Sequence, residues 1–129
     1  MLTHVAIIGA LVVAVSACAS SPAPVAYTPD AQQSASARDA YVACSTDSLW
    51  TIRTDSAKKA RAMDVAFVAE QKCANHREAL RQALAVDNGD TRGAREFANG
   101  YTDTFQERMV ASLAEAWMKD QERDSQATR

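Results

Sequence analysis

The stretch FANGYTDTFQERMVASLAEAW, residues 97–117, places a large residue at every fourth position. An α-helix turns once in about 3.6 residues, so each step of four advances about 40° beyond a full turn. Over the whole stretch this row of side chains winds by about 200° around the helix axis. A straight helix cannot present such a row to one neighbour, so we expect it to contact different partners along its length. The row consists of Phe97, Tyr101, Phe105, Met109, Leu113 and Trp117.

The dipeptide Asn99-Gly100 lies inside this stretch and offers an alternative, in which the helix breaks and Asp103 or Thr104 caps a new one. From residue 36 onward, however, the sequence is rich in alanine and free of proline, which favours continuous helices. We therefore predict a single helix over 91–122, with at most a kink at Asn99-Gly100.

A second periodic pattern covers residues 56–86, where apolar residues recur at steps of three and four. We expect one helix here, ending at Asp87-Asn88-Gly89-Asp90, because Asn and Gly tolerate the left-handed conformation that closes a helix. Its expected inner face consists of Val65, Ala66, Ala69, Cys73, His76, Leu80 and Leu84.

A first helix is expected from Ser36, as N-cap, to about Thr54, with Asp39 completing a capping box. Its inner face would carry Tyr41, Cys44, Ser48, Leu49 and Ile52. No convincing run of alternating β-branched residues suggests a strand. The sequence thus predicts an all-α fold, a small antiparallel bundle of about three helices.

Charges are balanced and mixed along the chain, with 14 lysines and arginines, 16 aspartates and glutamates, and a formal net charge of −2. The densest basic cluster, Lys58-Lys59 with Arg61, has Asp55 and Asp64 on its flanks, as on a solvated helix face. A nucleic-acid interface needs a net basic patch with interleaved aromatic residues. We therefore predict no nucleic-acid partner.

The N-terminal run VAIIGALVVAV, residues 5–15, carries no charge. At about 1.5 Å per residue it spans about 17 Å, well short of the roughly 30 Å hydrocarbon core of a bilayer. Its length and position are typical of the apolar region of an export signal, with an uncleaved membrane anchor as the weaker alternative.

The end of this run, Val15-Ser16-Ala17-Cys18, resembles the lipobox of bacterial lipoproteins: a branched apolar residue, two small residues and a cysteine. The resemblance implies cleavage before Cys18, a diacylglycerol on its sulfur and acylation of the new amine. It covers only the first 18 residues, and the leading MLTH contains no Lys or Arg. Ordinary signal cleavage after Ala17-Cys18-Ala19 is the alternative. Because Ala19 rather than Asp follows the cysteine, the resemblance implies the periplasmic face of the outer membrane.

These boundaries divide the chain into a signal peptide over 1–17, a lipidated cysteine with a flexible tether over 18–35, and a helical domain over 36–129. The tether holds all three prolines and little apolar bulk. Two or more acyl chains hold a protein on a membrane essentially permanently. The expected partners are the membrane, through Cys18, and a protein in the periplasm.

Cys44 and Cys73 remain as an even pair once Cys18 is lipidated, and in an exported protein such a pair predicts a disulfide. The bridge would close a loop of about 30 residues, worth about 3–4 kcal/mol in the chain-entropy account. Straight antiparallel helices with a turn near residue 55 would leave the two cysteines about 10 Å apart along the axis, whereas their Cα atoms must lie within about 7 Å. We therefore expect the first helix to extend toward Ala57, or the helices to cross at an angle.

Free thiols and a zinc site are the alternatives for these cysteines. The zinc site is considered because Cys73-x-x-His76 places two ligands within one helical turn and Cys44 could add a third. A second paired motif is missing, so we expect neither a metal nor another cofactor. His76 is then interpreted as a half-buried core residue beside the apolar face.

No catalytic constellation is visible, because the sequence lacks G-x-S-x-G, a phosphate-binding glycine loop and paired acids on a strand framework. Three acidic residues are expected to be outward-facing partners of Arg and Lys at helical spacing: Glu70, Glu78 and Asp64. We predict no enzymatic activity. The leading hypothesis is a non-enzymatic, membrane-tethered binding or structural module of the cell envelope, with an exposed partner-binding patch at Tyr101, Phe105 and Trp117.

Two other function classes remain open. An inhibitor or immunity-type partner of an envelope enzyme would need a protruding acidic loop, for which Asp87–Asp90 is the only candidate. That segment lacks the later ligands of a calcium loop, so a turn between helices is expected. An enzyme or metal carrier would be built around His76, Cys73 and Cys44.

Overall fold

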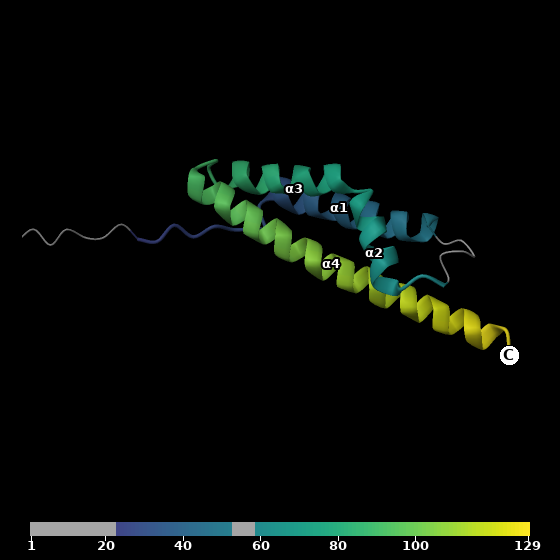
Figure 1. Ribbon diagram of the computed structural model, residues 1–129. Helices are drawn as coiled ribbons and strands as arrows, with labels where there is room; N and C mark the ends of the chain where they lie inside the picture. The colour runs from purple at the N-terminus through teal and green to yellow at the C-terminus, as the bar shows by residue number, and fades with distance from the viewer. Residues whose placement is uncertain (1–22, 53–58) are drawn as a thin grey trace, which may run out of the picture.

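The computed structural model describes residues 23–52 and 59–129, and within them the chain forms helices and no strand. The helices are α1 (Gln32–Thr51), α2 (Ala62–Gln71), α3 (Ala74–Asp87) and α4 (Arg92–Ala127). α3 runs antiparallel to α1 and α4, and the C-terminal end of α4 extends beyond the other helices (Figure 1). The predicted all-α bundle is confirmed, with one helix more than the three expected. The predicted turn at 54–56 lies outside the described residues.

α4 is one helix of 36 residues, so the alternative break at Asn99-Gly100 does not occur. Thr91 caps its start by accepting a hydrogen bond from the Ala94 backbone N–H at 3.1 Å. Along the winding row, Phe97, Tyr101 and Phe105 are half-buried, whereas Met109, Leu113 and Trp117 are buried. α4 packs against both α2 and α3, as the winding row predicts.

The predicted second helix is interrupted at Lys72-Cys73, where α2 ends and α3 begins. Cys73 has φ −106° and ψ 21°, and its N–H donates to the Glu70 carbonyl at 2.8 Å. The expectation of one helix over 56–86 was wrong because the apolar spacing continues through this break. α1 already ends at Thr51, so the bend at Cys73, rather than a longer first helix, brings the second segment to α1.

The start of α1 is capped by a residue from another helix. α1 begins at Gln32, and Ala31 before it offers no side-chain acceptor. Instead, the Asp87 carboxylate at the end of α3 accepts hydrogen bonds from the Ser34 N–H at 2.8 Å and the Ser34 hydroxyl at 2.6 Å. A carboxylate there also complements the positive end of the helix dipole. The predicted N-cap at Ser36 was therefore wrong, because a local capping motif cannot reveal a cap supplied across the bundle.

Part of the predicted flexible tether is packed on the bundle. The Thr28 N–H donates to the Asn88 side-chain oxygen at 2.8 Å, and the Asn88 side-chain nitrogen donates back to the Thr28 carbonyl at 2.9 Å. Tyr27 stacks on Phe97 with ring centroids 5.4 Å apart. A β-carbon at Gly93 would overlap the Tyr27 hydroxyl, so this glycine makes room for the ring. Tyr27 and Thr28 therefore pack on the helices.

Candidate functional site

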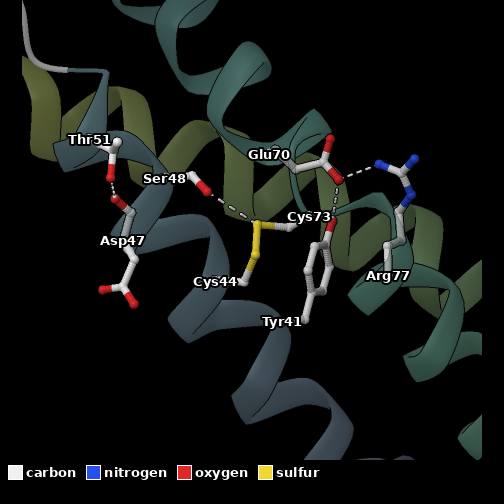
Figure 2. The surroundings of a disulfide bond; sticks show 8 residues. All are labelled: Tyr41, Cys44, Asp47, Ser48, Thr51, Glu70, Cys73 and Arg77. Carbon is white, nitrogen blue, oxygen red and sulfur yellow. Dashed lines mark hydrogen bonds and ion pairs between the residues drawn. A yellow bond between two sulfur atoms is a disulfide. The ribbon is translucent and has the colours of Figure 1, made fainter.

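The disulfide joins Cys44 on α1 to Cys73 at the α2–α3 break, as predicted, with Cα atoms 6.0 Å apart (Figure 2). Cys73 is fully buried, and the Ser48 hydroxyl lies 3.4 Å from its sulfur. Because both sulfurs are consumed by the bond, the alternative zinc site and the metal carrier built on it are ruled out. His76 is exposed rather than half-buried, since α3 starts in a new direction after the break.

Beside the disulfide, the fully buried carboxylate of Glu70 gathers hydrogen-bond donors from all four helices. One oxygen, Oε1, accepts from the Tyr41 hydroxyl of α1 at 2.5 Å and from the Arg77 guanidinium of α3. The other, Oε2, accepts from the side-chain amides of Gln71 and of Gln106 on α4, each at 2.9 Å. Figure 2 shows Tyr41 and Arg77 converging on this carboxylate. We call these five residues the Glu70 cluster.

The Glu70 cluster is internally satisfied. An ionised carboxylate offers about four lone-pair positions, and four donors occupy them here. A buried ion pair is tolerated when further hydrogen bonds compensate the loss of hydration, which is the situation of Glu70 with Arg77. No acceptor position is left for a substrate. The cluster therefore acts as a junction between helices.

Burial and the carboxylate shift two neighbouring ionisation equilibria. Burial raises the pKa of Tyr41 well above its usual value, and its hydrogen bond to Glu70 adds to the rise. For Arg77, burial lowers the pKa, but the hydrogen bond and negative charge of Glu70 outweigh that effect and raise it. Both shifts favour the protonated donors that Glu70 requires.

Of the three acidic residues expected to face outward, two do so. Glu78 is exposed and pairs with Arg81, and Asp64 is exposed and pairs with Arg61 at 3.0 Å. Glu70 was predicted wrongly. It lies four residues after Ala66 and three before Cys73, on the apolar face itself, and this spacing is the signal that could have identified it.

Five aromatic rings form a continuous row along α4. Tyr27 stacks on Phe97 at 5.4 Å between centroids. The pairs Phe97–Tyr101, Tyr101–Phe105 and Phe105–Tyr41 follow, each with centroids 6.0 Å apart. The row thus connects the docked N-terminal segment to the tyrosine that donates to Glu70, and such pairs add about 0.5–1.5 kcal/mol each beyond burial.

An open groove of about 400 Å³ lies between α1 and α4, near the lower end of the volumes found for ligand sites. Val42 on its α1 side is 42% exposed, and Arg108 is exposed on its α4 side. We call it the α1–α4 groove, and it is lined by Arg38, Val42, Thr46, Tyr101, Phe105, Arg108, Met109, Ser112 and Leu113. Arg38 donates to the Tyr101 hydroxyl at 3.1 Å and pairs with Asp30 at 3.3 Å.

The predicted partner-binding patch is only partly realised. Tyr101 and Phe105 line the α1–α4 groove, but Trp117 is 1% exposed and belongs to the core. The winding of the row explains the correction, since its C-terminal end has turned into the bundle interior. The sequence pattern did not identify Val42 and Arg108, because only the approach of α1 to α4 shows which exposed positions flank the rings.

The acidic segment Asp87–Asp90 is an ordinary turn between α3 and α4. Asp87 points to Ser34, and the Asn88 side chain is held by Thr28. Asp90 has a positive φ of 51° and pairs with Arg95 at 3.1 Å. No protruding acidic loop forms there, which removes the feature that the inhibitor alternative required.

Cys18 and the rest of the lipobox lie outside the described residues. Within residues 23–52 and 59–129, no group of histidine, cysteine and acidic side chains is arranged to hold a metal. In the same part of the chain we find no helix whose length and hydropathy would let it cross a bilayer.

No protein-family model, curated protein or solved structure matches this chain. Its functional interpretation therefore depends on the groove, the Glu70 cluster and the sequence signals described above.

Proposed function

We propose that this chain is a lipid-anchored protein of the bacterial cell envelope whose helical domain is a non-enzymatic binding module. The lipobox Val15–Cys18 supports the anchor, at the periplasmic face of the outer membrane. The Cys44–Cys73 disulfide supports an oxidising compartment, where such bonds persist.

The observation that carries the binding role is the contrast between the α1–α4 groove and the Glu70 cluster. The buried charges of the cluster are fully engaged by neighbouring helices. The groove instead leaves Val42, Arg108 and the edges of two half-buried rings open to solvent. A bundle whose buried Glu70 carboxylate is fully engaged, and whose surface carries an apolar groove, is suited to recognition.

The docked N-terminal segment limits how far this module can stand from a lipid anchor at Cys18. The nine residues that follow Cys18 and end at Tyr27 span at most about 30 Å when fully extended. Tyr27 is fixed next to the start of α4 by Gly93 and Phe97. A lipid on Cys18 would therefore keep Tyr27, and with it the start of α4, within about 30 Å of the membrane.

Photo-crosslinking in intact cells tests the binding role. A photoreactive amino acid replaces Val42 in the groove, and the matched control replaces Met118, an exposed apolar residue outside it. We expect a discrete protein adduct from position 42 and none from position 118. Equal adducts from both positions, or none from 42, would contradict the proposed use of the groove.

A further inference from the structure

A second hollow adjoins the α1–α4 groove on the surface of α4. The two share three lining residues, Tyr101, Phe105 and Arg108. The rings of Tyr101 and Phe105 stack with centroids 6.0 Å apart where the two hollows meet. We call the combined lining of both hollows the Tyr101–Phe105 surface; the second hollow adds Phe97, Gly100 and Thr104.

Gly100 is unexpected at its position, in the interior of a 36-residue helix. Gly100 is exposed, and a β-carbon added to it would meet no atom within 4 Å. Alanine would therefore fit and would favour the helix, so packing does not account for the glycine. Its missing side chain does keep the second hollow open beside Tyr101 and Phe105.

The charges of the Tyr101–Phe105 surface have one sign, although the chain as a whole is acidic. Its only charged lining residues are Arg38 and Arg108, and no aspartate or glutamate lines either hollow. Arg38 is held by the Tyr101 hydroxyl and the exposed Asp30. In the described part of the chain, the Arg108 guanidinium has neither an ion pair nor a hydrogen bond.

The two arginines are separated along the surface. Arg38 donates to the hydroxyl of Tyr101, and Arg108 follows Tyr101 by two turns of α4. Two turns separate the Cα atoms of Tyr101 and Arg108 by about 10 Å along the helix axis. A partner helix would present two carboxylates at that separation if they were seven residues apart.

We propose that the Tyr101–Phe105 surface binds an amphipathic helix of another envelope protein, in which two acidic residues about two turns apart flank apolar side chains. The apolar side chains would enter the two hollows and the carboxylates would meet Arg38 and Arg108, which is the helix-in-groove mode of recognition. The inference rests on the proposed function, because it names the partner chemistry of that same groove.

A defined peptide tests this chemistry. The probe is a fluorescent, stapled 15-residue helix with leucines along one face and two glutamates seven residues apart, and its partner probe carries glutamine at both positions. Fluorescence anisotropy measures binding to the mature protein in detergent micelles. We expect saturable binding of the glutamate peptide and at least tenfold weaker binding of the glutamine peptide.

Variants locate the site. Arg108→Glu should weaken binding of the glutamate peptide at least tenfold, whereas Arg92→Glu, an exposed arginine of α4 outside both hollows, should leave it unchanged. Gly100→Leu should abolish binding by filling the second hollow, whereas Gly100→Ala should preserve most of it. Circular dichroism confirms that each variant is folded.

Three results would overturn the inference: equal binding of the two peptides, equal effects of the two arginine variants, or binding of phosphatidylglycerol vesicles in place of the peptide. The last would assign the surface to the membrane. If neither peptide binds while photo-crosslinked adducts still form specifically at position 42, the proposed partner chemistry is wrong, but the proposed binding function is retained. If the adducts also fail, the proposed function fails with it.

Discussion

Replacing Glu70 by glutamine changes the one carboxylate on which donors from all four helices converge. Glutamine keeps the size of the side chain but has one acceptor oxygen, and its amide N–H groups would face two donors. Arg77 would also lose its counter-charge at a site where the carboxylate is 0% exposed. Removing one partner of a buried ion pair costs about 3–5 kcal/mol. We expect Glu70→Gln to lower the free energy of unfolding by about that amount, out of the roughly 5–15 kcal/mol typical of a domain.

Urea unfolding at pH 7, followed by far-ultraviolet circular dichroism with the disulfide intact, measures this loss. Glu78→Gln is the matched control, because Glu78 is an exposed glutamate of α3 that pairs with Arg81. Exposed pairs contribute about 0–1 kcal/mol, so the control should change little. If Glu70→Gln costs no more than the control, the cluster is not the junction that we describe.

Four further substitutions test individual contacts and one open helix position. Replacing Cys44 and Cys73 by alanine should lower the free energy of unfolding by about 3–4 kcal/mol, and an unchanged urea midpoint would contradict the bridge. The pKa of Tyr41 is raised on folding. The contribution of its hydroxyl to the free energy of unfolding is therefore fully present below the unfolded pKa of about 10 and is lost as the pH rises beyond that value. The stability difference between the native protein and Tyr41→Phe should therefore shrink between pH 9 and 12 in urea titrations, and a constant difference would count against this shift. Asp87→Ala should cost about 1–2 kcal/mol through the lost cap of α1, seen as a lower thermal midpoint; no change would show that the start of α1 does not depend on it. Gly100→Ala should add about 0.5–1 kcal/mol to the free energy of unfolding, and a loss would mean that the glycine has a structural role.

Local features of the sequence predicted much of the fold. Alanine-rich, proline-free segments indicated helices, and the winding row from Phe97 to Trp117 indicated that the last helix meets more than one neighbour. The disulfide was predictable because Cys44 and Cys73 fall on apolar helix faces. The mismatch in its geometry was also informative, since it called for either a longer first helix or helices at an angle, and the break at Cys73 supplies the angle.

Contacts between distant segments could not be predicted. The cap of α1 comes from Asp87, 53 residues beyond Ser34, and the donors to Glu70 include Tyr41 and Gln106, 29 and 36 residues away. No periodic pattern encodes such pairings, because each depends on how whole helices are placed. The same is true of the candidate site, where Tyr101 and Phe105 were identified from their row while the arginines around them were not.

The intact mass of the native protein extracted from membranes, with thiols alkylated before and after reduction, tests the lipid anchor and the disulfide together. We expect a chain that begins at Cys18 and carries acyl chains, and in which Cys44 and Cys73 become alkylated only after reduction. An unlipidated chain, or one with two thiols that react without reduction, would contradict this expectation.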